Sequence, residues 1–286
     1  MTLNRIAAAL LAGLWTAGAE AAVSCSLSAT SVNGVYVRTA NLNLSGTLTI
    51  TCTRTAGEAS QVIYIGVNEG EPPAGRVLTR QNGTETLAYQ VYRNPAYTGQ
   101  WTEAQGRAPG NANAGGLEFT MTLTGATTSS TVNYYLQVPA GTAKPAGIYD
   151  DLAITATLRP SRTGTPFGTA VFGATASIVD ECFFNSSPTP LALNYTSFSA
   201  TPVTGNSTFS VSCTQSTPYT MALDSTSATM PGLNIQYSLA LSSASSTGTG
   251  FAQSHSVTVT IPAGQQGTCA MASCSGTATR TVTLTY

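Results

Sequence analysis

Two adjacent aspartates and the single histidine are the first side chains in this sequence to consider for acid–base catalysis. Asp150 and Asp151 would point to opposite faces of a strand, whereas paired acid–base chemistry needs two carboxylates that converge on one site. We therefore expect them to lie in a structural turn. His255 sits in a Gly/Ser-rich stretch without an obvious base or metal partner, so we expect a surface histidine. The sequence predicts no catalytic residues, no metal, no cofactor and no enzymatic activity.

The six cysteines form three pairs by their spacing. In the sequence, nearly the same number of residues separates Cys25 from Cys52 as separates Cys182 from Cys213. The second cysteine of each pair ends a run in which apolar residues alternate. Alternation with period two turns both cysteines inward. Cys269 and Cys274 would close a short loop, and four residues separate them, whereas a redox motif has about two. We expect three disulfides, as is usual for an even number of cysteines in an exported chain.

The start of the chain indicates export. Asn4 and Arg5 precede an apolar run over residues 6–15, and small residues follow up to a favourable cleavage site at 19–21. We interpret residues 1–21 as a signal peptide that leaves Ala22 as the new N-terminus. Only 8% of all residues are charged, against about 25% in typical soluble proteins. So few Lys and Arg side chains argue against nucleic acid as a partner.

Two halves of the chain repeat the same strand pattern. Residues 131–141 and 256–264 are each an alternating run that ends in Pro-Ala-Gly, and each leads to a last alternating run, over residues 152–158 and 281–286. No segment has apolar residues at helical spacing with start and stop signals. The sequence therefore predicts an all-β protein with two β-sandwich domains, over residues 22–181 and 182–286.

The order of several short motifs resembles the spore coat protein U domain, the pilin-type domain of archaic chaperone–usher pili. These motifs are Asn33-Gly34-Val35-Tyr36, Arg76-Val77-Leu78, the run from Leu87 to Arg93, Trp101, Val138-Pro139-Ala140-Gly141, the run from Gly147 to Asp151 and the final run from Thr281 to Tyr286. The first half matches well. The second half matches at its cysteines, its Pro-Ala-Gly turn and its last strand, but it has residues 269–275 in place of the Gly-x-Tyr-x-Asp element.

The resemblance implies an immunoglobulin-like fold in which each pilin lacks its last strand and receives it from a periplasmic chaperone and then from the next pilin subunit. An outer-membrane usher is a further implied partner. In this chain the second domain ends on an edge strand that carries Val282, Leu284 and Tyr286, which we expect to accept such a donor strand. Residues 169–179 alternate again just before Cys182, and we expect them to complete the first domain as a donor strand in cis. Their apolar face consists of Ala170, Phe172, Ala174, Ala176 and Ile178.

The expected mature N-terminus favours a position at the tip of a fibre. Three residues precede Cys25 after cleavage, too few for a donor strand, so the subunit would receive a strand and give none. We expect export through the periplasm to the cell surface and an adhesive role there. The receptor stays unidentified. The loop that connects residues 159 and 168 is the first candidate for the adhesive tip, and two other loops follow it. The residues named in these loops are Pro166 and Phe167, then Val35, Tyr36 and Val37, then Pro72 and Pro73. For Tyr36 a core position is the alternative, and for Phe167 a turn contact.

Three hypotheses for the function stay open at this point. The first is a pilus-tip adhesin that mediates surface attachment and biofilm formation. The second is a polymerising spore coat or matrix protein that uses the same strand exchange without a dedicated receptor. The third is a soluble periplasmic binding protein or a carbohydrate-active enzyme, for which the sequence offers no motif.

Overall fold

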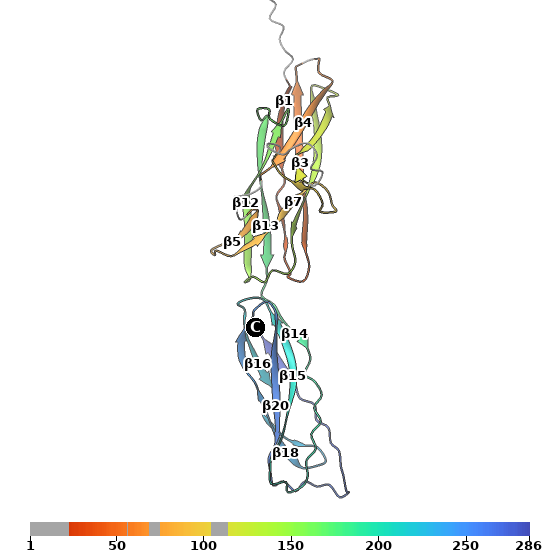
Figure 1. Cartoon of the computed structure of the whole chain (residues 1–286), viewed down its shortest axis with the longest axis vertical. Helices are drawn as coiled ribbons and strands as arrows, with labels where there is room; N and C mark the ends of the chain where they lie inside the picture. Colours follow the sequence, from red (N-terminus) through yellow and green to blue (C-terminus); the bar gives the residue numbers. More distant parts are fainter. Residues whose placement is uncertain (1–22, 56, 69–74, 104–113) are drawn as a thin grey trace, which may run out of the picture.

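The computed structural model describes residues 23–55, 57–68, 75–103 and 114–286 in two elongated bodies placed end to end (Figure 1). The expected signal peptide lies outside the described residues. The described part of the chain contains strands, turns and loops but no helix, and so no helix that could span a membrane. We call residues 23–178 the N-terminal domain, 179–181 the linker and 182–286 the C-terminal domain.

The N-terminal domain is a sandwich of two sheets whose strands alternate apolar and polar residues. Its first sheet has the order β1 (Val23–Ala29), β3 (Leu42–Arg54), β11 (Thr127–Val138), β7 (Gln90–Tyr92), β8 (Gln100–Trp101) and β9 (Ala114–Gly115). Its second sheet has the order β10 (Leu117–Thr122), β4 (Ser60–Val67), β12 (Gly147–Arg159), β13 (Gly168–Ile178) and β2 (Val32–Val35), with β5 (Val77–Arg80) paired to β12 and to β6 (Thr86–Ala88).

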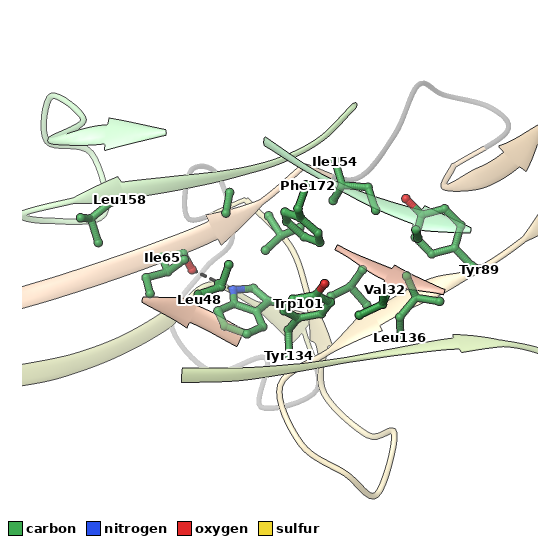
Figure 2. Close-up of a cluster of buried hydrophobic side chains, with 14 of the residues drawn as sticks. Val32, Leu48, Ile65, Tyr89, Trp101, Tyr134, Leu136, Ile154, Leu158 and Phe172 are labelled. Carbon is green, nitrogen blue, oxygen red and sulfur yellow. Dashed lines mark hydrogen bonds between the residues drawn. The ribbon is translucent and has the colours of Figure 1, made fainter. Parts of the chain in front are cut away.

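Large aromatic side chains fill the space between these two sheets. Trp101 and Tyr134 are fully buried, and the Trp101 Nε1 donates to the carbonyl of Ile65 at 2.9 Å (Figure 2). Tyr134 lies over Gly46, where any Cβ atom would collide with the ring, and its hydroxyl donates to the carbonyl of Thr30 at 2.5 Å. Each polar group of these rings thus has a partner, as burial of a polar atom requires.

The C-terminal domain is a smaller sandwich with its own core. Its larger sheet has the order β14 (Cys182–Ser186), β15 (Val203–Cys213), β20 (Ala252–Ile261), β18 (Ile235–Leu241) and β17 (Ser227–Met230), and its smaller sheet has the order β19 (Ser245–Thr247), β16 (Pro218–Leu223) and β21 (Val282–Thr285). The buried cluster includes Phe209, Val211, Tyr219, Met221 and Val257 and is separate from the cluster of the N-terminal domain. The prediction of an all-β fold built from two β-sandwich domains is confirmed.

The strands of the two domains correspond along most of their order. The sheet β14-β15-β20-β18 repeats β1-β3-β11-β7, and β19-β16-β21 repeats β10-β4-β12. The disulfides Cys25–Cys52 and Cys182–Cys213 join the first two strands of each domain, and Cys269–Cys274 closes a loop before β21. In the N-terminal domain the second sheet continues from β12 to β13 and β2. In the C-terminal domain β21 is the last strand of its sheet.

Candidate functional site

β13 lies between β12 and β2 and closes the N-terminal domain. It pairs antiparallel with β12 from Gly168 to Ile178, and it pairs parallel with β2, where Ala174 is opposite Val32 and Ala176 opposite Gly34. The parallel pairing means that β2 and β13 come from distant parts of the chain and that neither can form this edge by a local hairpin. The bounds of β13 agree within one residue with the segment expected from the sequence, 169–179.

The apolar face of β13 points into the core. Ala170, Phe172, Ala174 and Ala176 are buried, and Ile178 packs half-buried at the end of the strand. The Phe172 ring lies 4.7 Å from the ring of Tyr134, and Figure 2 shows it between the strands among the other core side chains. Burial of a phenylalanine side chain contributes about 1.5–3 kcal/mol. Removal of β13 would therefore uncover the centre of the N-terminal core.

β21 occupies the position of β12 in the C-terminal domain but has a partner on one edge alone. It pairs with β16, from Leu223 opposite Val282 to Thr220 opposite Thr285. All of residues 182–286 are described, and among them no strand pairs with the second edge of β21. Its backbone N–H and C=O groups on that side are thus free to bind an additional strand.

The core beside this open edge is only half covered. Val282 and Leu284 on β21 pack against the C-terminal cluster but stay partly exposed. On β14, in the facing sheet, the Phe184 ring packs at a tilt against the ring of Phe209, with centroids 5.9 Å apart, and yet 37% of Phe184 is exposed. Tyr286 follows β21 and is 61% exposed. A strand with apolar side chains on one face would cover the partly exposed side chains of Val282, Leu284 and Phe184.

One group of the predicted tip residues lies at the pole of the N-terminal domain next to the C-terminal domain. Tyr36 follows β2, which ends beside the C-terminal end of β13. It therefore lies at the pole of the N-terminal domain that faces the C-terminal domain. Its side chain is buried, and its hydroxyl donates to the carbonyl oxygens of Pro139 at 3.0 Å or Thr142 at 3.2 Å. Tyr36 is therefore a core residue, which is the alternative that the sequence left open, and Val35 and Val37 flank it at the pole that faces the C-terminal domain.

The loop between β12 and β13 lies at the opposite pole (Figure 1). Its Phe167 packs half-buried against the N-terminal core, so it is a turn contact, and Pro166 is exposed. The loop is held in place because Arg159 donates to the carbonyl of Gly164 at 3.0 Å and because Arg162 pairs with Glu118 at 3.4 Å. The other predicted tip residues, Pro72 and Pro73, lie outside the described residues.

The two aspartates are in β12 and not in a turn, which corrects that expectation. Asp151 accepts a hydrogen bond from the hydroxyl of Tyr89 at 2.7 Å, and Asp150 accepts one from Gln81 at 2.5 Å. The strand has an irregularity directly after them, between Asp151 and Ile154. Burial and the bond to the Asp151 carboxylate raise the pKa of Tyr89. Each carboxylate therefore has a separate structural partner, and the two do not converge on a common site.

His255 is buried, so the expectation of a surface histidine is wrong. It is 8% exposed, its Nε2 lies 2.9 Å from the hydroxyl of Tyr219, and burial lowers its pKa. This bond connects β20 to β16 and thus the two sheets of the C-terminal domain. The alternation of Val257, Val259 and Ile261, extended back by two residues, would have placed His255 on the inward face. In the described ranges, no three His, Cys, Asp or Glu side chains gather as metal ligands do.

Comparison with protein families identifies the sandwich. The family model of the spore coat protein U domain matches residues 12–157, about half of the chain. The chain belongs to the spore coat protein U domain family. The matched region ends inside β12, so the family model covers neither β13 nor the C-terminal domain. A comparison with curated proteins finds no match.

Several solved structures of pilus tip proteins are similar in outline to this spore coat protein U domain chain. The tip subunit in the CsuC–CsuE chaperone–tip pre-assembly complex from Acinetobacter baumannii is 12% identical, with a TM-score of 0.45 and coverage of 92% of this chain and 100% of that one. The CupB6 tip adhesin from Pseudomonas aeruginosa is 9% identical, with a TM-score of 0.39 and coverage of 93% and 95%. A chain from a chaperone–tip adhesin complex of CFA/I fimbriae is 12% identical, with a TM-score of 0.32 and coverage of 90% of this chain and 95% of that one.

Proposed function

We propose that this chain is the tip subunit of a chaperone–usher pilus and that it joins the fibre through a donor strand that pairs with β21. The observation that carries this proposal is the contrast between the two ends of corresponding sheets: β12 has β13 beside it, and β21 has no such partner among residues 182–286. The exposed part of Phe184 and the half-covered Val282 and Leu284 support an apolar donor strand at this edge.

The direction of the donor strand follows from the N-terminal domain. There the closing strand is antiparallel to its neighbour, since β13 is antiparallel to β12. β21 ends close to the N-terminal domain (Figure 1), so an antiparallel donor would run away from that domain. The residues that follow the donor, and the body of the subunit that supplies it, would lie beyond the far end of the C-terminal domain. Such a contact is head-to-tail and builds a filament.

The N-terminal domain fits the outer end of that filament. β13 is used to close its own domain, and β1 pairs with β3 from Val23 to Ala29. Both of these segments are therefore engaged inside the subunit and not available to another one. The pole with the loop 159–168 and Pro166 would point outward and contact the receptor, which gives surface attachment and biofilm formation. Export through the periplasm, capture by a chaperone and passage through an outer-membrane usher belong to the same proposal.

Co-expression with the chaperone tests the proposal. The variant Leu284→Asp places a charge on the inward face of β21 and should abolish the soluble one-to-one complex with the periplasmic chaperone in a pull-down. Thr283→Asp is the matched control, because Thr283 is an exposed neighbour on the other face of the same strand, and it should retain the complex. A stable, monodisperse full-length monomer without any chaperone would show that the C-terminal sheet needs no donor strand.

The role of the distal pole has its own experiment. Replacement of residues 160–166 by a Gly/Ser loop of the same length should weaken attachment of piliated cells to the surfaces that they colonise, while the amount of fibre stays unchanged. Equal attachment by both strains would remove this loop from the adhesive site and leave the assembly proposal untouched.

A further inference from the structure

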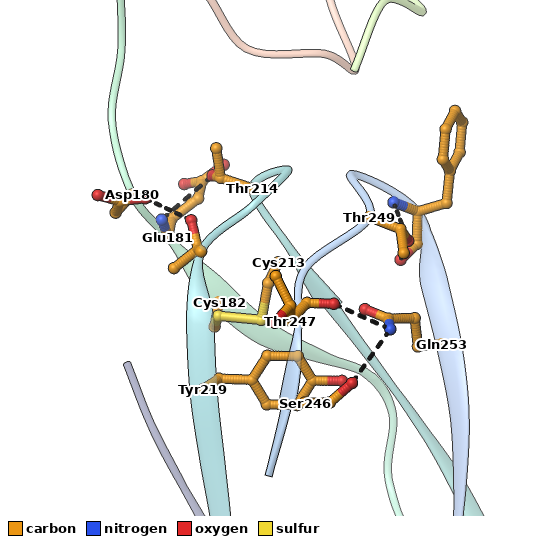
Figure 3. Close-up of a disulfide and its surroundings, with 12 residues drawn as sticks. Asp180, Glu181, Cys182, Cys213, Thr214, Tyr219, Ser246, Thr247, Thr249 and Gln253 are labelled. Carbon is orange, nitrogen blue, oxygen red and sulfur yellow. Dashed lines mark hydrogen bonds between the residues drawn. A yellow bond between two sulfur atoms is a disulfide. The ribbon is translucent and has the colours of Figure 1, made fainter. Parts of the chain in front are cut away.

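The linker between the domains has three residues, and both of its ends are fixed. Ile178, directly before it, is still in β13 and opposite Gly147 of β12. Cys182, directly after it, forms the disulfide to Cys213 and pairs with it in the sheet (Figure 3). Reorientation of the two domains would therefore have to come from rotations in Val179, Asp180 and Glu181 alone.

Each of these three residues is also bound to the turn that connects β15 and β16. The hydroxyl of Thr214 donates to the carbonyl of Val179 at 2.9 Å and accepts from the N–H of Glu181 at 3.2 Å. The N–H of Thr214 donates to the carbonyl of Glu181 at 3.0 Å, and the hydroxyl of Thr217 donates to the carboxylate of Asp180. Figure 3 shows this group directly above the disulfide. No linker residue is left without a bond to the C-terminal domain.

Three contacts pass directly from one domain to the other beside the linker. The backbones of Pro145 and Gln215 form a parallel β-bridge. The guanidinium of Arg38 lies 4.7 Å above the ring of Phe251, at the distance of a cation–π interaction. Gly250, with φ of 80°, lies so close to Ala143 that a side chain at this position would collide with it. These contacts involve two different loops of each domain, so they resist bending in more than one direction.

We infer that the linker is a clamp and that the two domains are held in one fixed orientation. A hinge needs a few residues that are free to change φ and ψ, and here disulfide, strand pairing and hydrogen bonds leave none. Residues 178–182, Thr214, Thr217 and the three direct contacts form this clamp. It acts regardless of which strand completes the C-terminal domain, so the inference does not rest on the proposed function.

Residual dipolar couplings of the mature full-length chain test the clamp. The amide N–H couplings of both domains should fit one common alignment tensor. The double variant Thr214→Val/Thr217→Val removes the side-chain bonds to the linker, and its two domains should then require two tensors. Two tensors in the unchanged chain would overturn the inference, and a single tensor that persists in the double variant would exclude the side chains of Thr214 and Thr217 from the clamp.

A second variant and a control separate loss of the clamp from loss of the fold. Arg38→Ser lies in the N-terminal domain, outside its sheets, and should increase the difference between the rotational correlation times of the two domains while both keep their amide spectra. Thr189→Val removes a hydroxyl that accepts from the N–H of Thr208 inside the C-terminal domain and should change neither measurement. If the difference between the correlation times of the two domains is the same in the unchanged chain and in Arg38→Ser, the Arg38–Phe251 contact is excluded from the clamp.

Discussion

The two domains share one strand order and differ in how their second sheet ends. In the N-terminal domain β12 is followed by β13 and β2, and the residues along this edge, such as Phe172 and Ala174, are buried. In the C-terminal domain β21 ends the sheet, and Phe184 on the opposite strand is partly exposed. The difference teaches that the same sandwich is a finished domain or an acceptor of a strand, depending on one segment of about eleven residues.

Under the proposed function, the difference gives each end of the molecule a separate task. A domain that supplies its own last strand folds without a partner and can present loops to the outside. A domain with an open edge has a ready template for strand addition, which makes it a connector and, when no donor is present, a site of aggregation. Four experiments can break or sharpen this comparison.

The largest effect is expected from removal of β13. Residues 22–181 should be soluble and fold alone, whereas residues 22–159 should be insoluble, since the strand that covers the core is missing. Soluble yield and circular dichroism measure both. A peptide with the sequence of residues 168–179, added during refolding of the shorter fragment, should restore the folded state. Equal stability of the two fragments would show that β13 does not close the domain.

Phe172→Ala should destabilise the N-terminal domain by about 3–5 kcal/mol, because it opens a cavity beside Tyr134. The matched control is Val171→Ala at the next position of the same strand, where 62% of the side chain is exposed, and it should stay within about 0.5 kcal/mol of the unchanged domain. Urea unfolding of residues 22–181 gives both values. Similar costs for the two variants would contradict the inward orientation of Phe172.

The contribution of each disulfide to stability should depend on the length of the loop that it closes. Replacement of Cys25 and Cys52 by alanine should cost about 3–4 kcal/mol in the N-terminal domain, because the bond closes a loop of 27 residues. Replacement of Cys269 and Cys274, which are five residues apart, should cost about 2 kcal/mol in the C-terminal domain. Thermal unfolding of the chaperone complex monitors the second pair. A larger loss for the short loop would mean that it shapes the open edge.

The smallest effect concerns pH and should appear in the C-terminal domain alone. Burial holds the pKa of His255 below its ordinary value of 6.5, so below about pH 6.5 the unfolded chain binds a proton that the folded domain does not. The stability of the C-terminal domain that is linked to neutral His255 is thus fully present above pH 6.5. It decreases as the pH falls toward the lower pKa of His255 in the folded state. His255→Gln should remove this dependence, measured as the melting temperature from pH 7.5 to 5. A dependence that persists in the variant would have another cause.

The inward faces of the strands could be predicted from the alternation of apolar residues in the sequence. The positions of the loops could not. The apolar face from Ala170 to Ile178 and the edge residues Val282 and Leu284 follow from period two, which a strand obeys wherever it pairs. The pole at which Tyr36 lies depends on the parallel pairing of β2 with β13, a contact across more than a hundred residues that leaves no local pattern. The expectation of a surface position for His255 failed for another reason. The Gly/Ser-rich sequence around His255 does not indicate that this residue continues the inward face of β20.

In the proposed fibre, the position of β13 has a mechanical consequence. Tension in a fibre would enter the N-terminal domain through Cys182 and pull β13 along its own axis. Since β13 begins at the proposed receptor loop 159–168, part of the pull would pass along its covalent backbone. The part that reaches the rest of the domain would load the hydrogen bonds to β12 on one edge and to β2 on the other together, in shear. A strand at the edge of a sheet, pulled from one end across its axis, would peel bond by bond under a much smaller force. The strand that completes the fold is thus also its anchor.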